Sequence, residues 1–406
     1  MARYKEYGYD IKDGVGIIPE WEMEIKEDAF KWCKELKRID IPQWVTKIGM
    51  RTFWGCLNLK ALTLPEWLEE IGENAFQNCS CLEEITLPRW TKKIGHGAFQ
   101  GCSNLTSITI PLSVIEIGRV VFCRCQKLTS ITVSKENMVY DSREDCNAII
   151  HTESNTLIRG CENTTIPASV TEIESHAFCG CIGLTSISIP PSVTEIGKEA
   201  FNNCSSLNNI SIPESVTVIG GSAFSGCSNL TSISIPPSVT EIGEKAFSGC
   251  SSLTSISIPP SITEIGRSAF WACSSLTSIS IPPSVTKIGG WAFRSCSSLT
   301  SIVVSKENKV YDSRKDCNAI IHTESNTLIR GCENTTIPPS VTEIGECAFR
   351  GCTSLTNISI PPSVTEIEYY AFEGCSSLTS ISIPKSCKVD KYASPCCPEN
   401  LVIIRY

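Results

Sequence analysis

The chain has 406 residues, with 35 Lys and Arg against 43 Asp and Glu, and a formal net charge of −8. The acidic balance and the lack of basic clusters exclude non-specific nucleic-acid binding, because phosphate backbones require clustered Lys and Arg. The sequence has no run of about 20 apolar residues, so membrane insertion is not expected. The first residues, MARYKEYGYDIKDG, have no apolar segment, so no secretory signal is predicted either.

A repeat of 23 residues runs through nearly the whole chain. Phe recurs at this spacing, and a Cys stands three residues after each Phe. Two intervals differ, and each spans 56 residues, which is one repeat of 23 plus one of 33. A fixed period of this length predicts stacked coils rather than separate globules. The recurring residues are Phe30, Phe53, Phe76, Phe99, Phe122, Phe178, Phe201, Phe224, Phe247, Phe270, Phe293, Phe349 and Phe372.

Each repeat predicts one coil with two short strands. In residues 200–222, AFNNCSSLNNISIPESVTVIGGS, the alternation of Ile210 and Ile212 is typical of a half-buried strand. Pro213 ends this strand because proline has no backbone N–H to donate to a neighbouring strand. A second β-branched stretch follows, Gly220 permits a sharp bend, and a helical turn begins near Phe224. One coil cannot bury its apolar face alone, so we expect a β-rich solenoid with strands about 4.8 Å apart.

The pattern LxxIxIPxSVTxIGxxAFxxCxx resembles the BspA-like leucine-rich repeats, and the resemblance covers roughly residues 15–406. It implies a right-handed coil with one long parallel sheet, short second strands and helical turns on the other side. It also implies a protein that binds other proteins, often at a cell surface during adhesion to host or partner cells. Enzymatic activity is not implied.

Composition along the chain predicts four regions. Residues 1–20 are an N-terminal cap, residues 21–95 are divergent repeats rich in Trp and charge, residues 96–386 are regular repeats, and residues 387–406 are a C-terminal cap. Two long repeats interrupt the regular ones, at residues 134–166 and 305–337. Residues 134–173 match residues 305–344 at 37 of 40 positions, which indicates a block duplication.

The ten added residues of each long repeat predict a projecting hairpin. In the first copy NAIIHT is followed by a turn at residues 153–155 and then by TLIRG. Two such hairpins could grip one partner bivalently; the alternative is repeat expansion without a selected role. His151 and His322 have acidic neighbours but no characteristic zinc spacing, so no metal site is predicted.

Thirteen of the 24 cysteines occupy one repeat position, from Cys33 to Cys375. Stacking allows disulfides between neighbouring coils, but each internal sulfur has two equivalent neighbours. We therefore predict a ladder of buried free thiols, which suits a reducing compartment. The pairs Cys123-x-Cys125 and Cys179-x-Cys181 lack the second half of a zinc motif. Cys396 and Cys397 are expected to be exposed.

The first 95 residues hold 30 of the 78 charged residues and six of the eight tryptophans. Four Trp residues follow a strand-ending proline at intervals of 23, where later repeats place Ser. Because interface hot spots favour Trp, Tyr and Arg, and an aromatic stripe flanked by mixed charge suits such a spot, these Trp residues and nearby outward strand positions form the candidate partner-binding site. An alternative role is to shield the end of the core. The candidates are Trp21, Trp44, Trp67, Trp90, Lys37, Arg38, Lys60, Glu83 and Glu84.

No enzyme is predicted, because the four His residues fit no nucleophile or metal frame and no phosphate-binding loop is present. We expect no cofactor. We expect a monomer whose partner is a protein, such as a host or cell-surface protein, or a glycan. A structural spacer without a specific ligand is the alternative. The localisation stays open, because the resemblance favours the cell surface whereas the thiols and the missing signal favour the cytoplasm.

Overall fold

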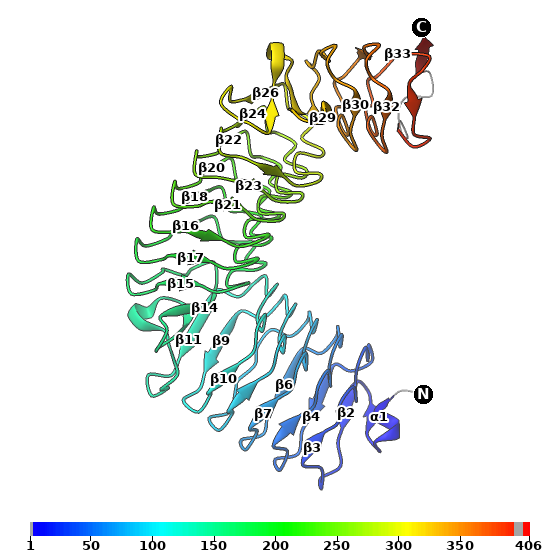
Figure 1. Cartoon of the computed structure of the whole chain (residues 1–406). Coiled ribbons are helices and arrows are strands. Elements are labelled where there is room, and N and C mark those ends of the chain that lie inside the picture. Colours follow the sequence, from blue (N-terminus) through cyan, green and yellow to red (C-terminus); the bar gives the residue numbers. More distant parts are fainter. Residues whose placement is uncertain (1–2, 394–400) are drawn as a thin grey trace. The chain divides into compact units, whose positions relative to one another are not determined.

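The computed structural model describes residues 3–393 and 401–406, so Cys396 and Cys397 lie outside the described residues. The chain forms two compact units, Met1–Leu207 (unit 1) and Asn208–Tyr406 (unit 2). Each unit is a β-solenoid whose coils follow one another in chain order, and each contains one long repeat (Figure 1). Among the described residues, no helix is suited to cross a bilayer.

Unit 1 begins with a short helix and a hairpin. Most coils then contain two strands: a strand of three or four residues, which we call the outer strand, and a strand of two residues that belongs to a second sheet. The hairpin and outer strands are α1 (Arg3–Glu6), β1 (Asp10–Lys12), β2 (Val15–Ile17), β4 (Arg38–Asp40), β6 (Ala61–Thr63), β9 (Ser107–Ile110), β11 (Ser130–Val133) and β16 (Ser186–Ser188). The second sheets contain β3 (Glu24–Ile25), β5 (Lys47–Ile48), β7 (Glu70–Ile71), β8 (Lys93–Ile94), β10 (Glu116–Ile117), β15 (Glu172–Ile173) and β17 (Glu195–Ile196). The first long repeat supplies β12 (Tyr140–Asp141), the 3₁₀ turn η1 (Arg143–Asp145), β13 (Ala148–His151) and β14 (Thr156–Gly160).

Unit 2 has the same organisation. Its outer strands are β18 (Asn209–Ser211), β20 (Ser232–Ser234), β22 (Ser255–Ser257), β24 (Ser278–Ile281), β26 (Ser301–Val304), β31 (Asn357–Ser359), β33 (Ser380–Ile383) and β35 (Val402–Arg405). The second strands are β19 (Val218–Ile219), β21 (Glu241–Ile242), β23 (Glu264–Ile265), β25 (Lys287–Ile288), β30 (Glu343–Ile344), β32 (Glu366–Ile367) and β34 (Lys388–Val389). The second long repeat supplies β27 (Tyr311–Asp312), η2 (Arg314–Asp316), β28 (Ala319–His322) and β29 (Thr327–Gly331).

The register of the strands confirms that equivalent positions of successive repeats stack. In unit 1, β4 and β6 pair in parallel with Arg38 opposite Ala61. In unit 2, β20 and β22 pair in parallel with Ser232 opposite Ser255. Each offset is one repeat, so a side chain that faces the core in one coil faces it in the next.

A column of Phe rings forms the centre of the core within each unit. Phe30 and Phe53 stack with ring centroids 5.5 Å apart, and Phe247 and Phe270 do so at the same distance. Both pairs are almost inaccessible to solvent. Tyr4 from α1 stacks on Phe30 at 5.7 Å, so the N-terminal segment covers the first ring of the column.

The bend of each coil lies on either side of the Phe, and not at the Gly after the second strand as the sequence suggested. Lys245 and Gly249, two residues before and after Phe247, have φ values of 55° and 74°. Gly266, which follows the second strand, is required for another reason. A Cβ there would lie 2.7 Å from the backbone N of Glu244 in the preceding coil. The turns around Phe close with single hydrogen bonds from residue i+3 to residue i rather than with helices.

The outer parallel sheet is divided into segments. In unit 1 it comprises β2–β4–β6, with β1 at one edge, and then β9–β11. Residues 82–87, where the repeat pattern predicts a strand, do not form one, although Ile85 and Leu87 are buried as expected. The long repeats also interrupt the sheet, because Asn147 Oδ1 accepts a bond from the Ile131 N–H beside β11 at 3.4 Å.

The hairpins predicted in the long repeats exist, but they do not project, and that prediction was wrong. Strands β13 and β14 are antiparallel, and β14 continues in parallel with β15 of the second sheet. Ile149, Ile150 and Leu157 are fully buried in this hairpin. The apolar strands fold into the solenoid because leaving these side chains in water would cost about 2 kcal/mol each. The bivalent grip therefore lacks its structural basis.

The stacked core predicts a sharp response to charge at an inward strand position. Ile256 is 9% exposed on β22, whereas its neighbour Ser257 faces outward. Ile256→Asp should lower the free energy of unfolding of unit 2 by roughly 3 kcal/mol or more, because a carboxylate would be buried without a partner. Limited proteolysis should cut this variant near β22, and the matched control Ser257→Asp should resist like the parent. Equal resistance of both variants would contradict the stacked core.

Candidate functional site

The four repeated tryptophans lie on the surface of unit 1, immediately after the outer strands. We call them the tryptophan edge. Their exposed fractions are 81% for Trp21, 64% for Trp44, 50% for Trp67 and 39% for Trp90. The indoles of Trp67 and Trp90 stack with centroids 6.1 Å apart, and Arg89 lies over the Trp90 ring at 5.0 Å. Among the described residues the other neighbouring pairs have no ring contact, so the predicted continuous stack is only partly formed.

In later repeats this position holds a Ser whose hydroxyl bonds the preceding coil. The Ser192 hydroxyl donates to the Val170 carbonyl of the preceding coil at 2.6 Å. In unit 2, Ser261 donates in the same way to Val239 at 2.7 Å. An indole carbon surface cannot make this bond and leaves apolar area in water. The tryptophan edge therefore replaces a hydrogen bond between coils with exposed aromatic surface.

The charged candidates form a row at the start of the outer strands β4 and β6 and at the equivalent positions of the next coil. Lys37, Lys60 and Glu83 occupy equivalent positions in three successive coils, and the Lys60 N–H donates to the Lys37 carbonyl at 3.0 Å. Arg38 and Glu84 are one position further on, and all five side chains are exposed. Arg38 pairs with Asp40 at 3.0 Å, an exposed ion pair of small stabilising effect. The row thus presents mixed charge that the fold does not need.

Other tryptophans lie beside the Phe turns rather than after the outer strands. In unit 1, Trp32 and Trp54 pack with centroids 5.4 Å apart, and Lys31 lies over Trp54 at 4.7 Å. In unit 2, Trp271 and Trp291 accompany arginines. The sequence analysis did not select these residues, because Trp271 and Trp291 do not recur at the same repeat position.

The thiol ladder is present, and its cysteines act as hydrogen-bond donors as well as small apolar groups. The Cys56 thiol donates to the Phe30 carbonyl at 3.0 Å, and Cys250 donates to Phe224 at 3.2 Å. The ladder cysteines keep their thiols, and all but the half-buried Cys33 are buried. Burial raises the pKa of Cys250 and that of Cys296 to about 12. Such thiols remain protonated at neutral pH, so the ladder is structural rather than reactive.

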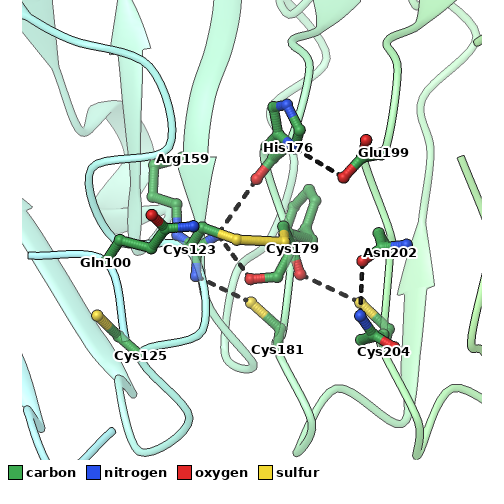
Figure 2. The surroundings of a disulfide bond; sticks show 12 residues. Gln100, Cys123, Cys125, Arg159, His176, Cys179, Cys181, Glu199, Asn202 and Cys204 are labelled. Atoms are coloured by element: carbon green, nitrogen blue, oxygen red, sulfur yellow. Dashed lines mark hydrogen bonds and ion pairs between the residues drawn. A yellow bond between two sulfur atoms is a disulfide. The ribbon is translucent and has the colours of Figure 1, made fainter. Parts of the chain in front are cut away.

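One disulfide, which the sequence analysis did not predict, joins Cys123 to Cys179 beside the first long repeat. The two residues are 56 positions apart, and their Cα atoms lie 5.1 Å apart. Each follows a Phe by one position, outside the ladder (Figure 2). The two turns become neighbours only once the hairpin folds into the solenoid, so no sequence signal pointed to this pair. The bridge also weakens the inference of a reducing compartment.

A buried arginine fills the space beneath this bridge. Arg159, on β14, is 4% exposed and donates from Nη1 to the carbonyls of His176 and Cys179 at 3.2 Å each. Figure 2 shows its guanidinium group between the turns that carry Cys125 and Cys181. Gly160 follows it because a Cβ there would lie 2.2 Å from Cε1 of Phe178. Backbone carbonyls thus hold a cation in the core without a carboxylate.

The histidines considered as metal ligands serve local turns. His151 Nδ1 lies 2.9 Å from the Ser154 hydroxyl, and His322 makes the equivalent contact with Ser325 at 3.0 Å. Within residues 3–393 and 401–406, no group of three or more His, Cys, Asp or Glu is placed to hold a metal ion.

The family model of the BspA type leucine-rich repeat region matches residues 23–147, 156–273, 217–318 and 325–399, in six copies. The chain belongs to this family. BspA-type repeats are generally protein-interaction or surface modules, and they are typically not enzymes.

Solved structures show the same fold as this BspA-type chain. A leucine-rich repeat protein from Bacteroides ovatus is 27% identical, with 98% of this chain and 97% of that chain covered and a TM-score of 0.50. A leucine-rich repeat protein from Eubacterium ventriosum is 20% identical, with 95% and 91% covered and a TM-score of 0.51, and this likeness concerns the fold alone. Among curated proteins, the sequence comparison finds no match.

The raised thiol pKa values predict that this BspA-type solenoid is labile to alkali. The unfolded thiols ionise above about pH 8.5, whereas Cys250 and Cys296 resist until about pH 12. Their stabilising contribution is complete below the unfolded pKa and falls by about 1.4 kcal/mol per thiol for each pH unit above it. Urea unfolding with a reductant at pH 8 to 11 measures this slope. Cys250→Ala/Cys296→Ala should reduce it by about 2.7 kcal/mol per pH unit; an unchanged slope would exclude the ladder as its cause.

The disulfide should stabilise unit 1, because it closes a loop of 56 residues in the unfolded chain. Cys123→Ser/Cys179→Ser should lower the free energy of unfolding by about 2–4 kcal/mol. Urea unfolding with and without reductant supplies the control. The parent with reductant should match the variant, and the variant should not respond to reductant. A variant as sensitive to reductant as the parent would place the stabilising bridge elsewhere.

Proposed function

We propose that this BspA-type protein binds a protein partner through the tryptophan edge of unit 1, as an adhesion or partner-binding module. The observation that carries the proposal is the exposure of four aromatic side chains at a position where later repeats place Ser. Large exposed apolar side chains have a cost in water, and interfaces draw much of their binding energy from Trp. The edge is therefore the surface of unit 1 best suited to a partner.

The row of charged candidates favours a protein partner whose surface carries complementary charges as well as apolar groups. Lys37, Arg38 and Lys60 are followed by Glu83 and Glu84 along the outer strands, so the surface changes from basic to acidic over three coils. A partner with the opposite order of charges would be steered into one orientation. Interfaces commonly combine an aromatic centre with such a polar margin.

The regular repeats of unit 2 are poorer candidates, because their hydroxyl groups are engaged within the array. The Thr254 hydroxyl donates to the Thr231 carbonyl at 3.3 Å, and Thr277 donates to Thr254 at 3.2 Å. The exposed Ser residues between them are small and uncharged, and Ser and Thr are under-represented in hot spots. These repeats support the spacer interpretation locally, and the proposal assigns recognition to unit 1.

The double variant Trp44→Ser/Trp67→Ser tests the proposal, because it introduces the Ser that later repeats use and should leave the fold intact. Immobilised parent and variant are incubated with extracts of the source cells and of cultured animal cells. We expect the variant to lose at least ten-fold of the protein that the parent retains. Far-ultraviolet circular dichroism and urea unfolding check that both proteins are equally folded.

Trp271→Ser is the matched control, because Trp271 is 41% exposed but lies beside a Phe turn of unit 2. It should retain the same proteins as the parent. Protease treatment of the extract should remove the captured material, whereas periodate, which destroys sugars, should not. Capture that survives the double variant, or that only periodate removes, would refute the proposed protein interface.

A further inference from the structure

Each long repeat leaves a gap in the row of Phe turns. It has no Phe turn of its own, and β29 passes beneath the next turn instead. The Gly331 N–H donates to the Ala348 carbonyl at 2.9 Å, and a Cβ at Gly331 would lie 2.3 Å from Cε1 of Phe349. The turns around Phe293 and Phe349 therefore face each other across a space that holds the side chain of Arg330.

In unit 1 the equivalent gap is closed. The Cys123–Cys179 disulfide spans it, and the Arg124 N–H donates to the Cys179 carbonyl at 3.0 Å. The cavity that remains is about 20 Å³. Arg159 beneath it also reaches a third acceptor, because its Nη2 lies 3.5 Å from the sulfur of Cys181.

In unit 2 the gap is open. The duplication offset of 171 residues places Arg294 and Arg350 where unit 1 has Cys123 and Cys179. The Arg350 carbonyl accepts from Arg330 Nη1 at 3.0 Å. The cleft between the two turns measures about 250 Å³. The two copies thus share one architecture, but only the second can admit a ligand.

Trp291 and Arg294 line one side of the open cleft, and Arg267 packs on the Trp291 ring. Trp291 stands where unit 1 has Val120. The guanidinium groups of Arg267 and Arg294 lie 4.4 Å and 5.5 Å from its ring centre. Trp291 Nε1 donates to Glu346 Oε1 at 3.2 Å, which holds the indole beside the cleft. Trp and Arg are the residue types most enriched in binding hot spots.

The hydrogen-bonding groups left without partners here are donors. Arg330 is 3% exposed, and among the described residues its Nε and Nη2 and the Nε of Arg294 have no acceptor. The Nε–Nη2 edge of a guanidinium is one that can hold a carboxylate by two parallel bonds. The two acidic groups of the cleft are engaged, because Glu346 accepts from Trp291 and Glu368 Oε2 accepts from the Glu346 N–H at 2.8 Å.

We propose that the cleft beside the second long repeat binds a carboxylate group, held by Arg330 and Arg294, with the adjoining apolar part of the ligand against Trp291. A buried guanidinium group without a counter-ion, such as that of Arg330, is costly, and a carboxylate satisfies it in both charge and geometry. The volume suits a group the size of an amino acid rather than a larger cofactor. The carboxylate can belong to a peptide C-terminus, to an acidic side chain or to a small organic acid.

Four probes distinguish these sources by isothermal titration calorimetry. They are acetylated trialanine with a free C-terminus, its C-terminal amide, the same amide with a central Asp, and sodium acetate. We expect at least one carboxylate probe to bind at least ten-fold more tightly than the neutral amide. The strongest of the three identifies the source of the carboxylate.

Two variants copy the closed cleft of unit 1 and leave Arg330 in place. Arg294→Cys/Arg350→Cys should form a bridge equivalent to that between Cys123 and Cys179, and Trp291→Val introduces the residue of unit 1. Each should weaken binding of the best probe at least ten-fold. Resistance of the buried ladder thiols to maleimide shows that the variants are folded. Arg330→Gln tests the guanidinium directly, provided that the same thiols remain protected.

The proposal is overturned if no carboxylate probe binds the parent more tightly than the amide does. It is equally overturned if the folded, oxidised double-Cys variant binds within two-fold of the parent. The control is Thr254→Ala, on the outer face of unit 2 and outside the cleft, which should bind like the parent.

Discussion

The stacking of equivalent positions, one repeat apart, is the constraint on which the rest of the structure depends. Between regular repeats a Phe ring lies on the ring of the next coil, as with Phe30 and Phe53 at 5.5 Å. The ladder thiol of a regular repeat bonds the Phe carbonyl of a preceding coil, as with Cys56 and Phe30 at 3.0 Å, whereas Cys181 and Cys352, which follow the long repeats, bond Gly160 and Gly331. Because these contacts bury the interior side chains of every coil, only side chains on the outer strands, at their ends and beside the turns remain for other molecules.

The long repeats matter because they break this stacking locally. Between regular coils, each Phe turn lies next to the equivalent Phe turn of the following coil. A long repeat has a buried hairpin and an arginine at the place of that neighbouring turn. Unit 1 closes the resulting gap with Cys123 and Cys179, and unit 2 leaves it open with Arg294 and Arg350. Residues 134–173 and 305–344 match at 37 of 40 positions, whereas the flanking turns carry Cys123 and Cys179 in unit 1 and Arg294 and Arg350 in unit 2, so the two copies differ around the gap.

The proposed binding function rests on the positions where the array departs from its consensus. The Ser and Thr positions of the regular repeats bond the preceding coil, as Ser261 does to Val239, and so serve the fold. Trp21 and Trp44 replace such a Ser and gain no equivalent bond, which leaves their surface available to a partner. Recognition then requires no pocket and no catalytic group, only exposed apolar area held rigidly on stacked coils.

The sequence by itself determined the coil, its register and its interior, because a fixed period forces each apolar position to meet its equivalent one repeat away. It also located the tryptophan edge, since Trp44 and Trp67 stand at a surface position of the repeat. Only the tertiary structure decided that the hairpins fold inward, that Cys123 meets Cys179, and that Arg330 lies beneath an open cleft. These contacts join residues across an interruption of the period, where the repeat no longer specifies which turns become neighbours.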